Sequence, residues 1–313
     1  MILVTGVAGF IGAKVAEFLI ETGEVVVGVD DLSLGKLSCV PQGVIFEEFD
    51  LSNNTQLIKK LAKYGDFKAV YHIAGQSGGE PSYDNPLRDL NCNTASTLNL
   101  LRLAVKSPNC VFVYASSVSV YGENGKTHFQ REDDMCNPKS FYGVGKLASE
   151  HYLRIYSDQY GLKTRALRLF NIYGPGQNLD NLRRGMVSIF VSQAIKNGQI
   201  TVRGSSDRYR DFVYINDAVN AFNLAANYPD LGHFIFNIST GIETSVEQLC
   251  LAISNEFDTV SVQYDGSTPG DIHGYTGDPS RANDVLGWIA TTPLSVGLSE
   301  MSLWAKKANG VSR

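Results

Sequence analysis

A tyrosine and a lysine stand four positions apart at Tyr142 and Lys146, and this pair could transfer protons. Residues at this spacing share one face of a helix, so the phenol and the ammonium would be neighbours. A tyrosine is a poor base at neutral pH because its ordinary pKa is about 10. A nearby ammonium favours the phenolate and brings this pKa toward the working range. The same spacing also arises from a surface tyrosine beside a solvated lysine, so its meaning depends on the surrounding elements.

A hydroxyl partner for this pair is expected at the end of a strand that faces the same crevice. Ser116 and Ser117 end an apolar run shortly before the tyrosine. Ser117 comes just before a Val-Tyr-Gly turn at 120–122, where its hydroxyl could polarise a substrate oxygen. We therefore expect Ser117 to be catalytic and Ser116 to be mainly structural. The alternative is that both serines cap the turn through local backbone hydrogen bonds.

The element that would position a ligand against these groups lies at the start of the chain. An apolar strand over 1–5 leads into Gly6, Gly9 and Gly12, and helical spacing follows over 13–20. Without side chains, the backbone N–H groups of such a turn can approach a pyrophosphate, and the helix dipole favours the negative charge. A plain strand-to-helix turn is the alternative, because the spacing is G-x-x-G-x-x-G rather than G-x-G-x-x-G.

A second apolar strand, over 24–31, ends in Asp30 and Asp31. Asp30 lies roughly 20 residues after the glycine turn, where a carboxylate accepts hydrogen bonds from adenosine ribose hydroxyls. A carboxylate there repels a 2′-phosphate, which favours NAD over NADP. The alternative is a solvated acid at a strand end.

Strands and helices alternate through the first half of the chain. Strands are predicted at 1–5, 24–31, 44–50, 69–74, 110–116 and 164–170, and helices at 13–20, 54–64, 87–106 and 141–160. This alternation predicts an α/β fold with a Rossmann-type, doubly wound parallel sheet. Ligands of such sheets bind at the carboxyl ends of the strands, which here are marked by Gly6, Asp30, Asp50, Ala74, Ser116 and Phe170.

The regular alternation of strands and helices ends after 174–176, where turn-rich segments separate shorter elements. We expect an NAD-binding domain over 1–170 and a smaller C-terminal α/β substrate-binding lobe over 171–313. The segment around 211–240 contains an apolar run that could rejoin the sheet.

Composition limits the classes of partner. The net charge of −5 and the lack of a Lys/Arg block argue against nucleic acid and membrane surfaces. The five cysteines form no C-x-x-C motif, and the histidines are scattered, so we expect reduced thiols, no metal and a cytoplasmic protein. The chain opens on a strand and a glycine turn, so we also expect no signal peptide.

The chain resembles the extended short-chain dehydrogenase/reductase superfamily, in its nucleotide-sugar epimerase/dehydratase branch, and is similar to UDP-glucose 4-epimerases. The matching motifs run nearly end to end and lie at 5–12, 30–36, 50–51, 72–76, 116–122, 142–146, 168–175, 210–214, 269–271 and 286–288. The resemblance implies an NAD-dependent enzyme that acts on a nucleotide sugar, with Ser117, Tyr142 and Lys146 as its catalytic residues.

Residue by residue, the resemblance and the motifs assign two binding sets. The set expected to bind NAD is Gly6, Gly9, Phe10, Ile11, Gly12, Asp30, Asp31, Leu32, Ser33, Gly35, Asp50, Leu51, Ile73, Ala74, Gly75, Gln76, Asn93, Ser116, Tyr142, Lys146 and Phe170. The set expected to bind the sugar nucleotide is Ser117, Tyr142, Asn171, Arg210 and Asp271. In the family, an asparagine and an arginine like Asn171 and Arg210 contact the diphosphate. The planar guanidinium of an arginine can donate two parallel hydrogen bonds to a phosphate. A structural pair with Asp211 is the alternative for Arg210.

Two departures from the family pattern bear on the reaction and the sugar. Dehydratases of the family carry an Asp-Glu pair after the hydroxyl residue, whereas this chain has Val118 and Ser119, which disfavours dehydration. Family members that bind UDP-sugars commonly read Arg-Pro-Gly-Asp near the C-terminal lobe, whereas this chain has Thr268 in place of the arginine. A Gly-Gly pair at 78–79 beside the expected sugar site is also unusual.

We therefore expect a nucleotide-sugar epimerase that acts at C4 through a transient 4-keto sugar, with tightly bound NAD and a UDP-sugar as the favoured substrate. A 4-ketosugar reductase and a 2-epimerase use the same three residues and stay open, as does a non-catalytic NAD(H)-binding regulator. The resemblance also suggests a homodimer that pairs the helices around 87–106 and 141–160. Apolar residues on these helices are equally consistent with packing on their own sheet.

Overall fold

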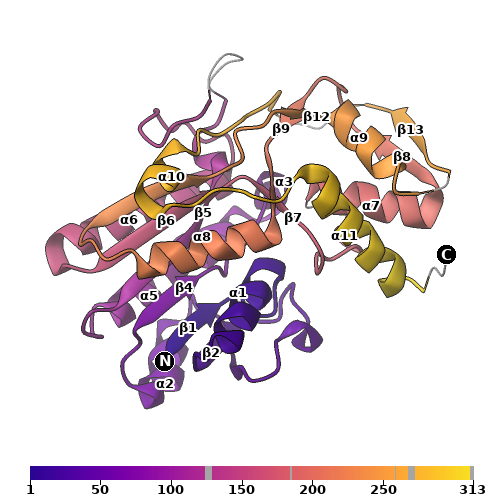
Figure 1. Ribbon diagram of the computed structural model, residues 1–313. Helices are drawn as coiled ribbons and strands as arrows, with labels where there is room; N and C mark the ends of the chain where they lie inside the picture. The colour runs from indigo at the N-terminus through magenta and orange to yellow at the C-terminus, as the bar shows by residue number, and fades with distance from the viewer. Residues whose placement is uncertain (124–128, 184, 258, 267–271, 311–313) are drawn as a thin grey trace.

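Parallel strands form one central sheet in the computed structural model, which describes residues 1–123, 129–183, 185–257, 259–266 and 272–310. The seven strands lie in the order β11-β6-β5-β4-β1-β2-β3 (Figure 1). Their bounds are β1 (Ile2–Thr5), β2 (Val26–Asp30), β3 (Ile45–Glu48), β4 (Ala69–His72), β5 (Val111–Ser117), β6 (Lys163–Leu169) and β11 (His233–Ile238). Every neighbouring pair is parallel, which confirms the predicted Rossmann-type α/β sheet.

The strand order reverses beside β1. The chain forms β2 and β3 on one side of β1, and then crosses to the other side to form β4, β5 and β6. A crevice opens at such a reversal, at the carboxyl ends of the parallel strands. β1, β4 and β5 are buried along their whole length, because helices cover both faces of a parallel sheet.

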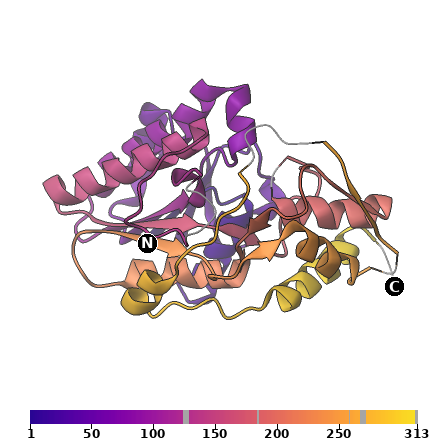
Figure 2. The same ribbon diagram turned by 90° about the horizontal axis from the view of Figure 1, so that it is seen from above.

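Helices pack on both faces of the sheet (Figure 2): α1 (Phe10–Glu21) and α8 (Ile215–Asn227) on one face, and α2 (Asn54–Leu61), α5 (Ser96–Ala104) and α6 (Phe141–Tyr160) on the other. Each face has its own apolar core. Leu19 and Phe222 belong to the first core, and Leu100 and Leu153 to the second. The sheet edge that carries the carboxyl ends is therefore held rigidly from both sides.

The helical stretch expected over 87–106 is present over 86–104, but it is not α-helical throughout. α4 (Pro86–Leu90) is followed by a π-helical segment, Asn91–Ala95, and only then by α5. A π-helical turn holds one residue more than an α-helical turn, which rotates the side chains that follow it. The short helix α3 (Gly79–Asp84) comes just before α4 and covers part of the crevice.

The C-terminal part forms a smaller α/β lobe beside the sheet (Figure 1). Its main elements are α7 (Met186–Asn197), β8 (Gln199–Val202), α9 (Val246–Ser254), β13 (Ser261–Tyr264) and α11 (Leu294–Ala308), with β8 and β13 paired in parallel. The remaining elements of the lobe are β7 (Asn171–Tyr173), β9 (Tyr209–Arg210), β10 (Phe212–Tyr214) and β12 (Thr244–Ser245). The helix α10 (Ser280–Leu286) instead packs on β11 and α8, beside the sheet. β7 pairs with β10, and β9 pairs with β12.

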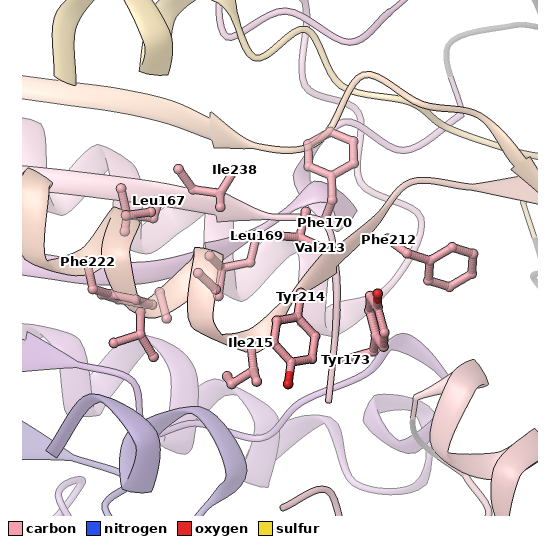
Figure 3. Close-up of a cluster of buried hydrophobic side chains, with 14 of the residues drawn as sticks. Leu167, Leu169, Phe170, Tyr173, Phe212, Val213, Tyr214, Ile215, Phe222 and Ile238 are labelled. Carbon is pink, nitrogen blue, oxygen red and sulfur yellow. The ribbon is translucent and has the colours of Figure 1, made fainter. Parts of the chain in front are cut away.

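One apolar cluster joins this lobe to the sheet (Figure 3). Leu169 and Phe170 stand where β6 ends, and Tyr173 follows them in β7. The Tyr173 ring packs edge-on against Phe212 and Tyr214 of β10, with ring centroids 6.3 and 5.7 Å apart. Because these side chains belong to the same core as those of the sheet, the lobe is fixed beside the crevice.

The segment that we expected to return to the sheet contains β11, which pairs with β6 over the full length of β11. The chain therefore passes through part of the lobe before the sheet is complete. The domain division into 1–170 and 171–313 stays a prediction.

Candidate active site

A cleft of about 1060 Å³ opens at the carboxyl ends of the parallel strands. It is lined by most of the predicted site residues, namely Gly6, Gly9, Phe10, Ile11, Gly12, Asp30, Asp31, Ser33, Gly35, Asp50, Leu51, Ile73, Ala74, Gly75, Gln76, Ser116, Ser117, Tyr142, Lys146, Phe170 and Asn171. Leu32, Asn93 and Arg210 are described but are not among the lining residues. Asp271 and Thr268 lie outside the described residues.

The glycine turn at the floor of the cleft requires its glycines. Gly6 has a φ of +71°, and a Cβ added there would lie 2.8 Å from the backbone nitrogen of Ala74. A Cβ on Gly12 would lie 2.0 Å from the carbonyl oxygen of Gly6. α1 begins at Phe10, and its N-cap residue Gly9 makes no side-chain cap, so the first N–H groups of the helix stay available to an anion.

Asp30 ends β2 and shapes the turn beside it. Its Oδ2 accepts a hydrogen bond from the backbone nitrogen of Ala8 at 3.0 Å, and its Oδ1 accepts one from that of Leu32 at 2.9 Å. Burial raises the pKa of this carboxyl, and the two backbone hydrogen bonds oppose that effect. Each carboxylate oxygen keeps a further lone pair for a hydroxyl donor in the cleft. Leu32 thus supports Asp30 through its backbone.

Ser117 ends β5 and begins a tight turn over Val118–Val120. Its Oγ accepts a hydrogen bond from the backbone nitrogen of Ser119 at 3.2 Å and donates one to the Ser119 hydroxyl at the same distance. The hydroxyl therefore caps the turn and also lines the cleft. The two alternatives for this serine, a turn cap and a group that faces the substrate, are compatible.

Tyr142 stands in the first turn of α6, directly against this serine turn. Ser140 caps the helix by accepting a hydrogen bond from the backbone nitrogen of Gly143 at 3.1 Å. A Cβ on Gly143 would lie 2.5 Å from the carbonyl oxygen of Ser119. Gly143 is therefore the residue that lets the helix start so close to Ser117. Gly143 directly follows Tyr142 in the sequence, and that position was the one signal that could have indicated its role.

Lys146 lies one turn further along α6 and is buried beside Tyr142. Its Nζ donates to the carbonyl of Ala115 at 2.8 Å, and lies 4.7 and 5.7 Å from the ring centroids of Tyr114 and Tyr142. Burial lowers the pKa of Lys146 to about 8, although the carboxyls of Asp89 and Glu150 act in the opposite direction. The ammonium and the phenol face the same end of the cleft.

A buried ion pair supports the strand beneath these groups. Arg168 binds Glu150 with two hydrogen bonds, Nε to Oε1 at 3.0 Å and Nη2 to Oε2 at 2.7 Å. The Ser116 hydroxyl donates to Glu150 Oε1 as well. No sequence pattern indicates the role of Glu150, because an acid inside a helix usually marks a solvated face.

Asn93 lies beneath the cleft rather than in its wall. Its Nδ2 donates to the carbonyl of Gln76 at 3.1 Å, so Asn93 fixes the loop that follows β4. A Cβ on Gly75 would lie 2.4 Å from Asn93 Oδ1 and 3.5 Å from Lys146 Nζ. Gly75 thus lets the cleft floor approach both buried groups.

Two predicted diphosphate ligands have different surroundings. Asn171 lines the cleft, where its Nδ2 donates to the carbonyl of Asp211 at 2.9 Å. Arg210 donates to the carbonyls of Ile272 and His273 at 2.9 and 3.2 Å, and its guanidinium stacks 4.8 Å from the ring of Tyr275. The role of Arg210 on a diphosphate stays a prediction.

The carboxylate of Asp211 accepts hydrogen bonds inside the lobe. Its Oδ1 accepts from the backbone nitrogen of Thr240 at 2.8 Å, and its Oδ2 accepts from that of Gly241 at 3.0 Å. Asp211 therefore holds the loop after β11.

An ion-pair bridge crosses the cleft wall. Arg183, in the loop before α7, donates from Nη2 to Glu80 at 3.1 Å and from Nη1 to Asp84 at 2.6 Å. Both acids belong to α3, which follows β4. The bridge therefore connects a loop of the lobe with the sheet side of the cleft.

The model of the NAD dependent epimerase/dehydratase family matches residues 2–239 of this chain. The chain belongs to this family. A UDP-glucose 4-epimerase of Mycolicibacterium smegmatis is 33% identical over 305 residues, which are 95% of this chain and 96% of that protein. The family assignment explains why the cleft-lining motifs recur in order along the chain.

Two solved structures of epimerases of this kind share the whole fold. The UDP-glucose 4-epimerase of Thermotoga maritima, solved with UDP-glucose, is 33% identical, with a TM-score of 0.93, and the match covers 98% of this chain and 99% of that chain. The UDP-glucose 4-epimerase of Thermus thermophilus, solved with NAD, is 30% identical, with a TM-score of 0.91 and the same coverage.

NAD is the cofactor of this family, and the residues of this cleft fit it. The glycine turn leaves no room for a Cβ and presents helix N–H groups where a pyrophosphate would bind. Asp30 is buried at the end of β2, roughly 20 residues after the turn, which is the sequence spacing of a carboxylate that binds ribose hydroxyls. The carboxylate also matches a ribose without a 2′-phosphate.

Within the described ranges, no helix is both long and apolar enough to cross a membrane. In the same parts of the chain, no group of three or more His, Cys, Asp or Glu side chains is placed to hold a metal ion.

Proposed function

We propose that this protein is an NAD-dependent nucleotide-sugar epimerase that acts at C4 of a UDP-sugar through a transient 4-keto sugar. The observation that carries the proposal is that Ser117, Tyr142 and Lys146 line the same cleft as the glycine turn, with Lys146 hydrogen-bonded to the strand that ends in Ser117. The family match and the epimerases of similar structure support the same reaction.

Each of the three side chains has a role that follows from its position. The Tyr142 phenolate takes the proton from the sugar 4-hydroxyl and later returns it. The Ser117 hydroxyl donates a hydrogen bond to the sugar oxygen as negative charge develops on it. The Lys146 ammonium lies beside the Tyr142 ring and favours the phenolate. Bound NAD supplies the acceptor and donor of the hydride at the sugar carbon.

The turn after Ser117 favours redox chemistry over elimination of water. Elimination needs an additional acid and base near the sugar, and carboxylates supply them in dehydratases of this family. Here the turn contains Val118, which is buried, and Ser119, whose backbone nitrogen donates a hydrogen bond to the Ser117 hydroxyl. Neither residue offers a carboxyl group to the cleft.

A homodimer is part of the proposal, because α4 and α6 expose large apolar side chains. Leu87 and Leu90 are 73% and 50% exposed, and Val144 and Ile155 of α6 are 53% and 43% exposed. A second copy of the chain would bury these side chains against its own α4 and α6. Sedimentation velocity tests this interface, and a Val144→Glu variant should sediment as a monomer.

We also propose that the protein is located in the cytoplasm. The free cysteines are Cys39, Cys92, Cys110, Cys136 and Cys250. Free thiols are typical of a reducing compartment.

The reaction is tested by incubating the purified protein with UDP-, GDP-, CDP- and dTDP-sugars, without added cofactor, and following the products by NMR. We expect interconversion of the C4 epimers of a UDP-sugar. Turnover that consumes added NADH stoichiometrically would indicate a ketosugar reductase. A product inverted at C2 would indicate a 2-epimerase, and bound NAD without turnover of any sugar would indicate a regulator.

A further inference from the structure

Asp89 is a buried carboxylate beside the catalytic lysine, and neither the sequence motifs nor the reaction above uses it. Its side chain is 1% exposed, and its Oδ2 accepts a hydrogen bond from Asn93 Nδ2 at 3.2 Å. A Cβ on Gly145, the residue before Lys146, would lie 3.4 Å from Asp89 Oδ1, so the acid packs against α6 here, and its charge acts on Lys146. Among the described residues, no lysine or arginine forms an ion pair with Asp89.

The chain around Asp89 is built to hold this acid inside the protein. Asp89 lies in α4, and the π-helical segment Asn91–Ala95 begins two residues later. π-Helical turns are rare in proteins, and those that occur are often found at functional sites. The backbone carbonyl of Asn93 accepts hydrogen bonds from the Thr97 and Ser149 hydroxyls at 2.7 and 2.8 Å. This network ties the segment to α6.

The other groups around Lys146 do not replace the charge of Asp89. Glu150, one turn along α6, already shares its charge with Arg168 through two hydrogen bonds. His72 of β4 is fully buried, and its burial, followed by the Lys146 charge, holds its pKa well below the ordinary value, so this ring is neutral. Tyr114 of β5 and Tyr142 of α6 present their rings to the ammonium.

Burying an ammonium without a countercharge is unfavourable, and the group responds by losing its proton. Lys146 is 4% exposed, and its one hydrogen bond within the described part of the chain is to the carbonyl of Ala115. A carbonyl stabilises the charge less than a carboxylate does. Of the two carboxyls that oppose deprotonation, Asp89 therefore contributes more than Glu150, whose charge is shared with Arg168.

We propose that Asp89 is a positioning residue that keeps the Lys146 ammonium protonated inside the cleft, and so keeps Tyr142 usable as a base up to mildly alkaline pH. This inference rests on the proposed function, because it assigns Lys146 and Tyr142 to catalysis. Asp89 does not line the cleft, so it acts on the reaction through Lys146 rather than on the substrate.

The first test is the pH profile of kcat for the NAD-loaded enzyme and its Asp89→Asn variant. The asparagine can still accept the hydrogen bond from Asn93, but it carries no charge. The alkaline limb of the profile, where Lys146 loses its proton, should move down by about one pH unit. A profile that is lowered evenly at every pH, without movement of this limb, would overturn the proposal.

A matched control separates charge from stability. Asp217 in α8 is also a buried carboxylate, and it accepts hydrogen bonds from Thr291 and Thr292 at 3.1 Å each. Asp217→Asn should destabilise the protein and leave the alkaline limb in place. If Asp89→Asn does not fold, the pair Asp89→Glu and Asp89→Gln makes the same comparison, because these side chains match in size and differ in charge. Only the glutamine variant should shift the limb.

A second readout needs no substrate. Lys146 has a pKa of about 8 in the folded chain against an ordinary value of 10.5, so the unfolded chain binds more protons between these values and stability rises with pH there. Without the Asp89 charge, the folded-state pKa is lower still and the rise begins at lower pH. The melting-temperature deficit of Asp89→Asn should therefore shrink between about pH 7 and pH 9.

The two readouts distinguish the possible failures. If no sugar is turned over but this deficit shrinks with pH, the electrostatic role of Asp89 stands and the proposed reaction fails. A deficit that stays constant with pH would refute the role of Asp89, whatever the reaction is.

Discussion

The ammonium nitrogen of Lys146 lies 2.8 Å from the carbonyl oxygen of Ala115, to which it donates a hydrogen bond. Ala115 stands two residues before Ser117 in β5, a strand that is buried along its whole length. The lysine is therefore fixed to the same strand that ends in Ser117, the proposed catalytic serine. This bond sets the distance between α6 and β5 at the reactive end of the cleft, so Tyr142 and Ser117 reach the substrate from rigid elements.

Replacing Tyr142 by phenylalanine should abolish the transfer of the hydroxyl proton. The ring keeps its packing and the proton acceptor is lost, so kcat should fall about 10²–10⁴-fold, while NAD stays bound. Epimer formation followed by NMR measures the rate, and absorbance after protein release measures the NAD content. A variant with a near-normal rate would exclude Tyr142 as the base.

Replacing Gly12 by alanine should prevent NAD from binding, because the added Cβ would lie 2.0 Å from the carbonyl oxygen of Gly6 and force the turn to open. The bound NAD of the purified variant, measured after heat release, should be close to zero. The matched control is Gly23→Ala, since a Cβ there meets nothing within 4 Å and costs only the strain of a φ of +86°. Equal NAD content in both variants would contradict the role of the turn.

Replacing Glu150 by glutamine should destabilise the fold, because it leaves the buried Arg168 guanidinium without its countercharge. The free energy of unfolding in urea should fall by about 3–5 kcal/mol. The control is Asp158→Asn in the exposed pair of Arg154 and Asp158, 3.8 Å apart, where we expect a loss below about 1 kcal/mol. Similar losses for the two variants would mean that burial of the pair does not matter.

Replacing Arg183 by alanine should weaken sugar binding more than folding. The side chains of Arg183 and Glu80 are about half exposed, at 47% and 50%, so their ion pair contributes little to stability. Its loss opens one wall of the cleft, and KM should rise several-fold with little change in kcat. Salt screens exposed charges, so KM of the wild type should rise between low and high ionic strength, whereas KM of the variant should not. A KM that is equal in the two proteins would refute this role of the bridge.

The sequence predicted those parts of the site that follow from local chain geometry. The glycine turn, Asp30 and Ser117 all lie within a few residues of a strand end, and strand ends meet at one edge of a parallel sheet. A role that depends on distant neighbours leaves no such local pattern. No motif marks Asp89 or Glu150, and only packing against α6 and Arg168 shows that they are buried.

Two further features required the three-dimensional structure. The π-helical segment Asn91–Ala95 keeps the apolar spacing of a long helix, so periodicity alone does not detect it. The side chain of Arg210 turns toward the carbonyls of Ile272 and His273, a loop that lies over sixty residues away along the chain. Neither feature leaves a local pattern in the sequence.

The late return of the chain to β11 has a consequence for biosynthesis. While residues 233–238 are still unmade, β6 is an open edge of the sheet, with unpaired N–H and C=O groups along it. In a nascent chain that stops near residue 170, strands of other molecules can therefore pair with the open edge of β6. The glycine turn is already complete in such a chain. We expect fragments truncated there to aggregate, and the glycine turn to become useful only after most of the polypeptide has left the ribosome.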